Sequence, residues 1–194
     1  LLSLLLHLSC QNSKPDSNQK NTLKTVVSET SLVVLGTVQD AGSPHIACKK
    51  ECCKNLFEKP DPLRKVVSLG FIDPQNNKSI LFEATPDITT QLKNLKQFSN
   101  REHELPDAIF VSHAHIGHYT GLMYLGKEAT NANQVPVYVM PRMKGFIENN
   151  GPWRQLVSNK NIVLKEVQNK QEIKLSSNLR VIPFKAVSYT HLTL

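Results

Sequence analysis

Apolar residues are grouped along this chain in short runs separated by polar turns, a pattern that predicts strands and helices in succession. Runs of strand length lie at 31–38, 66–72, 79–82, 107–112, 135–140, 161–167 and 179–184. The second and third runs flank the segment 73–77, DPQNN, whose composition is typical of a turn. These two runs therefore predict a hairpin.

Helical spacing is clearest after this hairpin. Ile88, Leu92 and Leu95 recur at the interval that places side chains on one helix face. Thr85 can cap this helix, and Pro86 would then occupy its first position. We therefore expect a helix that packs its apolar stripe against the sheet.

Shorter helices are predicted over 119–125 and 141–147, each after a strand-like run. Pro136 favours an edge strand or the start of a strand for the run 135–140. The hairpin and the strand–helix units together predict an α/β fold in a single domain.

Three histidines follow the strand-like run 107–112. His113 and His115 alternate along an extended chain, so both imidazoles can face one ion, and His118 begins the next turn. Imidazole binds zinc and iron well, and open α/β sheets hold their ligands at the carboxyl ends of strands. The alternative is a histidine-rich surface loop, because single histidines are more often structural or solvated. The spacing favours a metal site.

The chain resembles a known family at this point. The segments 34–44 (VLGTVQDAGSP), 83–88 (EATPDI) and 118–122 (HYTGL), together with the histidines, are similar to metallo-β-lactamase fold hydrolases. The similar branch contains pyrroloquinoline quinone biosynthesis protein B, and the resemblance covers 31–184. It implies that this chain forms the N-terminal portion of an αββα sandwich.

The resemblance also implies a ligand set. His113 and His115 would hold a first metal ion, and His118 would help to hold a second. The family pattern His-x-His-x-Asp-His has an aspartate where this sequence has Gly117, which donates nothing. The cofactor that the resemblance implies is zinc, as one ion or two, with iron as the alternative. On this reasoning, an aspartate introduced at Gly117 would raise the metal content.

Two carboxylates are further candidates for the site. Asp87 lies at the start of the helix, where it could anchor the histidines as a catalytic-site residue or serve the helix amino end. Asp40 lies on the glycine-containing loop after the first strand, and this loop approaches the active site in the resembling family. We interpret Asp40 first as a turn-forming residue and second as a site contact.

A second cluster combines imidazole and thiols. Its members are His45, Cys48, Cys52 and Cys53. They could hold a structural zinc, as the cysteine cluster of the resembling branch implies, but adjacent cysteines rarely bind one ion together. Disulfide pairing is the alternative in an oxidising compartment, although these three thiols are an odd number.

The two ends of the chain differ from its middle. The run 1–10, LLSLLLHLSC, is too short to span a bilayer and resembles the end of a bacterial lipoprotein signal with Cys10 as the lipidated residue. The polar stretch 11–30 would be a tether that holds the domain 31–186 near a membrane. A buried strand or helix is the alternative for 1–10. The last residues, 187–194, resemble a translated sequencing adapter, and a native strand end is the alternative.

The formal charge of the chain is +7, and 40% of its residues are hydrophobic. The lysines are scattered and no nucleic-acid motif is present, so we expect a solvated surface and no nucleic-acid partner. The sequence does not indicate an oligomeric state.

We therefore expect a metal-dependent hydrolase in the bacterial cell envelope that acts on a small molecule. A metal-activated water would attack an ester, lactone, amide or phosphodiester-type substrate. The first alternative is an iron-dependent oxygenase like the quinone-cofactor biosynthesis protein. The second is an envelope binding protein without catalysis. Gly117, in place of the family's aspartate, is the feature that supports this alternative. The sequence does not identify the substrate.

Overall fold

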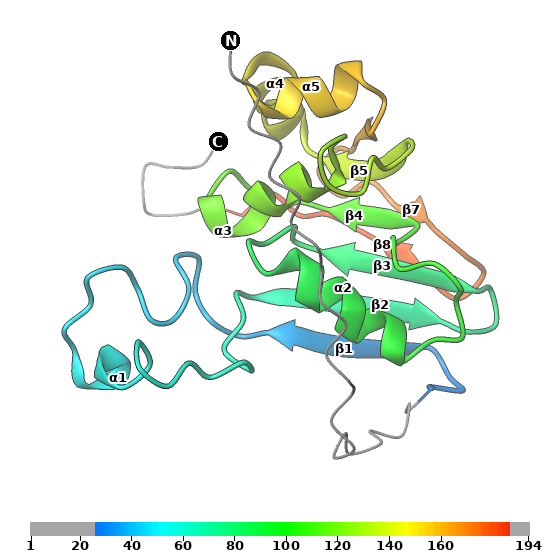
Figure 1. Ribbon diagram of the computed structural model, residues 1–194. Coiled ribbons are helices and arrows are strands. Elements are labelled where there is room, and N and C mark those ends of the chain that lie inside the picture. Colours follow the sequence, from blue (N-terminus) through cyan, green and yellow to red (C-terminus); the bar gives the residue numbers. More distant parts are fainter. Residues whose placement is uncertain (1–25, 187–194) are drawn as a thin grey trace, which may run out of the picture.

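One mixed sheet forms the centre of the protein (Figure 1), as seen in a computed structural model that describes residues 26–186. The strands are β1 (Ser31–Gly36), β2 (Ser68–Asp73), β3 (Lys78–Phe82), β4 (Ala108–Phe110), β5 (Val135–Val139) and β6 (Ile162–Glu166), and they lie in this order across the sheet. The first three strands are antiparallel, and β3 to β6 are parallel. The predicted hairpin is thus β2–β3, and the strand–helix units form the parallel half.

Helices connect the parallel strands. They are α2 (Ile88–Gln97), α3 (Ile116–Tyr119), the 3₁₀ helix η1 (Thr120–Leu125), α4 (Pro141–Asn149) and α5 (Trp153–Ser158). α2 lies across one face of the sheet in Figure 1. The short helix α1 (Glu51–Lys54) belongs instead to the long connection between β1 and β2, which projects from the body.

The main core lies between these helices and one face of the sheet. Leu81 and Ile109 of the sheet and Leu122 and Ile147 of the helical layer are fully buried there. Side chains alternate along strands, so the same strands present a second apolar face to the opposite side.

That second face is lined with aromatic rings. Phe110 stacks between Phe82 and Tyr138, with ring centroids 5.3 and 4.6 Å apart. The hairpin of β7 (Ile173–Lys174) and β8 (Arg180–Val181) packs here, next to the buried side chain of Leu179. The sheet is therefore apolar on both faces, as a layered α/β fold requires.

A buried carboxylate fastens the β7–β8 hairpin to the sheet. Asp73 at the end of β2 accepts hydrogen bonds from Ser176 Oγ at 2.5 Å, Asn76 Nδ2 at 2.7 Å and Asn178 Nδ2 at 3.3 Å. Burial raises the pKa of Asp73, but these hydrogen bonds outweigh it and the net pKa is lowered. The β7–β8 hairpin is thus held to the sheet partly by hydrogen bonds to a charged carboxylate.

Most predicted elements are confirmed, with some corrections. The helices α1 and α5 were not predicted, and the last strand is confined to β8. Pro136 is the second residue of the interior strand β5, so the edge position was wrong and the alternative, the start of a strand, is confirmed. The helix α2 begins after Asp87, and the Thr85 hydroxyl accepts the Asp87 N–H at 3.0 Å.

Some predictions concern residues outside 26–186. These are the lipidation of Cys10, most of the tether and the adapter-like end at 187–194. Within the described part, no helix has the length and apolar character needed to cross a bilayer.

Candidate metal centre

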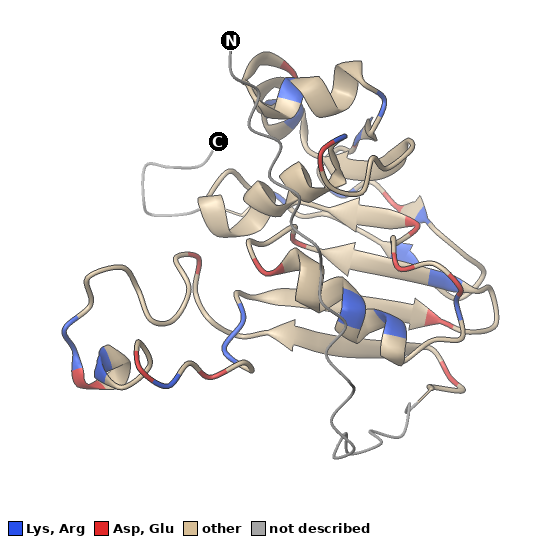
Figure 2. Cartoon of the chain, viewed as in Figure 1, with Lys and Arg blue, Asp and Glu red and all other residues tan. Residues whose placement is uncertain are grey.

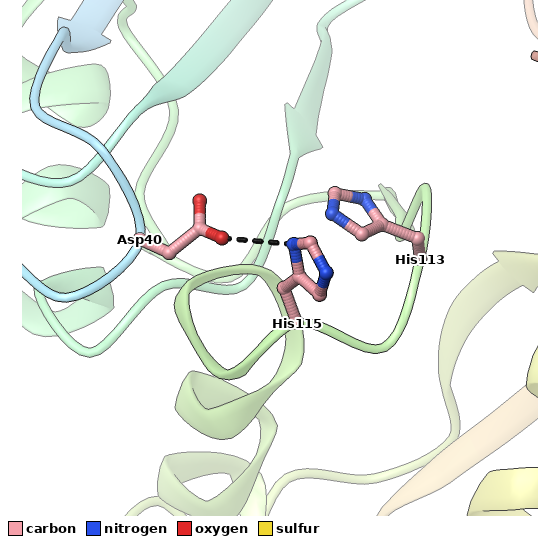
Figure 3. A group of neighbouring side chains, drawn as sticks. All are labelled: Asp40, His113 and His115. Atoms are coloured by element: carbon pink, nitrogen blue, oxygen red, sulfur yellow. Dashed lines mark ion pairs between the residues drawn. The ribbon is translucent and has the colours of Figure 1, made fainter. Parts of the chain in front are cut away.

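The histidines lie where the sequence placed them, at the carboxyl end of a parallel strand. β4 ends at Phe110, and the chain then turns through His113 and His115 into α3. Figure 3 shows these two imidazoles beside the carboxylate of Asp40, which comes from the loop after β1. One ligand atom from each of the three residues lies within 4.8 Å of the other two.

Asp40 bridges two of the histidines. Its Oδ2 lies 2.9 Å from His115 Nδ1, and its Oδ1 lies 2.9 Å from His118 Nε2. Asp40 also forms a turn, because Gly42 N donates to Gln39 O at 2.9 Å. Both interpretations of this residue are therefore correct, and its contact with the histidines is closer than the sequence indicated.

His113 completes the group from the other side. Its ring centroid lies 4.4 Å from that of His115 and 4.2 Å from that of His118. Ser112 Oγ lies 2.8 Å from His113 Nδ1, which leaves Nε2 free to act as a ligand. Burial and then the neighbouring imidazoles lower the pKa of His113, which favours the neutral form that binds metals.

His118 is the buried member of the cluster, with 8% of its side chain exposed against 41% for His115. Its Nδ1 lies 3.2 Å from Glu83 Oε2, in an ion-pair contact whose alignment falls short of a hydrogen bond. Burial lowers the pKa of His118, but Glu83 and Asp40 outweigh it and the net pKa is raised. His118 thus lies between two carboxylates, one at each ring nitrogen.

Glu83 is a site residue that the sequence analysis missed. It follows β3, and its Oε2 also accepts the Ser112 N–H at 3.2 Å. Its φ of +72° is in the left-handed region, which a non-glycine residue adopts only when its surroundings hold it there. The signal that could have identified Glu83 is the arrangement of the strands, because β3 and β4 are parallel and Phe82 is in register with Phe110. The residues that follow them therefore meet at one edge.

The residues present fit a divalent metal ion. Two imidazoles and a carboxylate are ordinary ligands for zinc and iron. Nitrogen and oxygen ligands about 2.1 Å from one tetrahedral ion lie about 3.4 Å apart, so ligand atoms that lie within 4.8 Å of one another would close on an ion by side-chain rotation.

The absence of a side chain at Gly117 has a steric cause. An ideal Cβ on Gly117 would lie 2.5 Å from Asp40 Cα and 2.7 Å from Asp40 O. Real side chains do not tolerate such contacts, so an aspartate at this position would displace Asp40. The expected rise in metal content with an aspartate at this position therefore stays a prediction, and it requires Asp40 to move.

Asp87 is not brought to the histidines. Its Oδ2 accepts the Val66 N–H at 2.8 Å, and its Oδ1 lies 3.6 Å from Lys65 Nζ. The expected role of Asp87 as an anchor of the histidine cluster, or as a catalytic residue, is thus not supported by its contacts. Glu83 occupies that place instead.

The cysteine cluster lies in the projecting connection between β1 and β2. Cys52 Sγ and Cys53 Sγ are 3.8 Å apart, and Cys53 is buried. His45 Nε2 contacts Gln39 Nε2. Within residues 26–186, no three of the four predicted ligands gather closely enough to form a metal-binding group. The structural zinc at His45, Cys48, Cys52 and Cys53 stays a prediction.

Comparison with solved structures supports this architecture. Zn²⁺-bound PqqB from Methylobacterium extorquens is similar with a TM-score of 0.64 at 19% identity, over 79% of this chain and 51% of that one. A diphosphatase from the PhnP family is similar with a TM-score of 0.55 at 22% identity, over 75% of this chain and 53% of that one. At such identities the likeness establishes the fold, and the chain spans about half the length of these two proteins.

A search of curated proteins finds no match. The family model described as "Beta-lactamase superfamily domain" matches residues 78–192, more than half of the chain. This range includes Glu83 and all three histidines of the cluster. The chain therefore belongs to the beta-lactamase superfamily.

Proposed function

We propose that this protein is a metal-dependent hydrolase whose ion is held by His113, His115 and Asp40. The observation that carries the proposal is the approach of one ligand atom from each of these residues to within 4.8 Å at the edge of the sheet. A bound divalent ion would supply a Lewis acid that lowers the pKa of water toward neutrality and polarises a carbonyl or phosphoryl group.

The protein's own residues would hold and orient this centre. His113 and His115 are partly exposed, so a small molecule can approach them from solvent. His118 lies behind them and is buried, with Asp40 Oδ1 at 2.9 Å from its Nε2. We assign His118 to holding a proton between Asp40 and Glu83, and to fixing the Asp40 carboxylate toward His115. A second ion would need further ligands besides these residues.

Metal content and hydrolysis test this proposal together. Purified protein should bind Zn²⁺ and hydrolyse at least one simple aryl ester, lactone, anilide or aryl phosphodiester. His113→Ala, His115→Ala and Asp40→Ala should each weaken zinc binding by about 100-fold or more, because each leaves an incomplete coordination shell.

The matched control is His103→Ala. His103 contacts Arg101 at 2.6 Å and is not a member of the metal-binding group, so its loss should leave zinc binding unchanged. Full zinc retention in both His113→Ala and His115→Ala would refute the site.

A second candidate is an iron-dependent oxygenase, and one observation favours it. Two histidines and one carboxylate form the ligand set of non-haem Fe(II) oxygenases, and Asp40 supplies that carboxylate here. Anaerobic loading with Fe²⁺ or Zn²⁺, followed by measurement of oxygen uptake and of substrate hydrolysis, separates the two candidates. Oxygen uptake that requires Fe²⁺ and is lost in Asp40→Ala would favour the oxygenase.

A further inference from the structure

The connection between β1 and β2, residues 37–67, carries Asp40 and is fixed to the body at a narrow base. We call it the 37–67 loop. Figure 1 shows it projecting from the sheet, with α1 near its far end. At the base Val38 pairs with Val66, Val38 N donates to Lys65 O at 2.9 Å, and Val67 N donates to Val38 O at 2.8 Å. Asp40 is two residues beyond this base, so the position of its carboxylate depends on how the base is held.

Figure 2 shows that the 37–67 loop bears charges of both signs along its length. Two of its apolar residues are largely exposed, with Ile46 at 96% and Leu63 at 84%. The outer part of the loop therefore makes little core of its own, and its base must supply the rigidity.

Two side chains hold the base through the backbone of one residue. Asp87 Oδ2 accepts the Val66 N–H at 2.8 Å, and Gln91 Nε2 donates to Val66 O at 2.7 Å. Gln91 is fully buried, and its Oε1 accepts a hydrogen bond from Thr85 Oγ1 at 2.6 Å. Both polar backbone groups of Val66 are thus bound to residues at the start of α2.

The residues just before Asp87 hold the other half of the site. Ala84 N donates to His118 O at 2.8 Å, and Gly121 N donates to Ala84 O at 2.8 Å. Glu83 contacts the His118 ring. The segment 83–91 therefore binds the histidine-bearing turn through its first residues and the base of the 37–67 loop through its last ones.

These two halves meet again where Asp40 contacts His115 and His118. We propose that Asp87 and Gln91 are positioning residues that set the Asp40 carboxylate against the imidazoles by fixing Val66. This inference rests on the proposed metal site, but it concerns residues that contact no candidate ligand. Asp87 thus acts on the site through the loop rather than by contact with the histidines.

Metal affinity in a double-mutant cycle tests the proposal. Co²⁺ is the probe, because a thiolate charge-transfer band distinguishes any ion bound to cysteines from one bound to histidines. Asp87→Ala should weaken Co²⁺ binding at the histidines by about tenfold or more. In an Asp40→Ala background the same substitution should change the affinity less than about twofold, because Asp87 acts through Asp40. Asp87→Asn keeps an oxygen that can accept the Val66 N–H and should restore most of the affinity.

Asp107→Ala is the matched control. Asp107 also accepts a backbone N–H, from Ser79 at 2.8 Å, and it pairs with Lys78 and Arg101 at the opposite end of β3. It should lower the melting temperature without changing Co²⁺ affinity. Additive effects of Asp87→Ala and Asp40→Ala, or an equal loss of affinity in Asp107→Ala, would overturn the proposal.

A metal-free measurement separates this inference from the proposed function. The ¹⁵N resonances of the His115 and His118 imidazoles report their contacts with Asp40. In Asp87→Ala they should shift toward the values of Asp40→Ala, and in Asp107→Ala they should stay at the wild-type values. If the protein binds no Co²⁺, the proposed function fails, and these resonances still decide the role of Asp87: unchanged values would reject it.

Discussion

Gly117 and Asp40 lie so close together that residue 117 has no room for a side chain. A Cβ on Gly117 would meet Asp40 Cα at 2.5 Å and Asp40 Cβ at 2.9 Å. The glycine therefore allows a carboxylate from a distant loop to reach the histidines. In this chain the carboxylate of the metal-binding group comes from position 40, next to the main-chain turn that carries the histidines.

Substitution of Gly117 should therefore weaken metal binding without removing any ligand. Gly117→Ala should displace Asp40 and reduce Zn²⁺ affinity by about tenfold or more, as expected when the support of a ligand is lost. Isothermal titration calorimetry measures this change.

Gly145→Ala is the control for that substitution. Gly145 lies in α4, and an added Cβ would meet nothing within 4 Å besides the backbone of its own helix and its chain neighbours. This change should leave zinc affinity unchanged and stabilise the protein by about 0.5–1 kcal/mol, because alanine favours a helix over glycine. Equal zinc affinities in the two variants would contradict the steric account.

The Asp73 network should make stability depend on acid pH. The pKa of Asp73 is lowered in the folded protein, so its contribution to stability is present above the ordinary value of 3.8 and is lost as the pH falls through the folded value. Asp73→Asn should cost about 1–3 kcal/mol near neutral pH and flatten the acid limb of the stability curve. Urea unfolding at a series of pH values checks this.

Asp61→Asn serves as the comparison for Asp73. Asp61 is exposed and accepts one backbone N–H, from Leu63 at 2.9 Å. Its loss should change stability by less than about 0.5 kcal/mol. An acid limb that is the same in Asp73→Asn and wild type would show that Asp73 is not responsible.

The apolar face at β1 should promote self-association. Leu32 and Val34 are 59% and 61% exposed on this edge strand, whereas the adjacent Leu35 is buried. Val34→Lys should reduce association in sedimentation velocity experiments and change stability little. Leu35→Lys should instead destabilise the protein by more than about 3 kcal/mol, since it buries an unpaired charge. Association that is unaffected by Val34→Lys would exclude this surface as its cause.

The cysteines of the 37–67 loop offer a separate test of zinc binding. The 3.8 Å between Cys52 Sγ and Cys53 Sγ matches the separation of two thiolates on one tetrahedral zinc, about 3.8 Å for a Zn–S distance of about 2.3 Å. Cys52→Ser and Cys53→Ser should each lower the zinc content by one ion and leave the histidine site loaded. Zinc content equal to wild type, with one disulfide found by thiol titration, would favour the alternative of disulfide pairing.

The sequence was most informative where a local pattern and a structural role coincide. The hairpin around 73–77, the stripe of α2 and the three histidines are all short-range signals, and the structure confirms their places. Pro136 was less informative, because its missing N–H matters only once the neighbouring strands are known. α5 was missed because it is short and opens without a capping side chain.

The site was only partly predictable for a different reason. The spacing of His113 and His115 is enough to identify them as candidate ligands. Asp40 and Glu83 are brought to the cluster by the arrangement of the sheet, which a short-range pattern does not reveal. Asp87 was a candidate anchor for the histidines because it is acidic and near a strand end, with a role at the helix amino end as the alternative, and its carboxylate binds Val66. The chemistry of single residues identifies Asp87 as a candidate. The register of β3 against β4 brings Glu83, rather than Asp87, to the histidines.

The contact between Asp40 and His118 joins residues 78 positions apart in the chain. Such a contact forms only after the intervening strands have aligned, since a long stretch of chain must be ordered before its ends meet. We therefore expect the metal-binding group to form late in folding, so a bound ion should slow unfolding far more than it accelerates folding. Metal binding would then stabilise the native topology only after it has formed. Metal depletion would shorten the lifetime of the folded protein and leave its folding pathway unchanged.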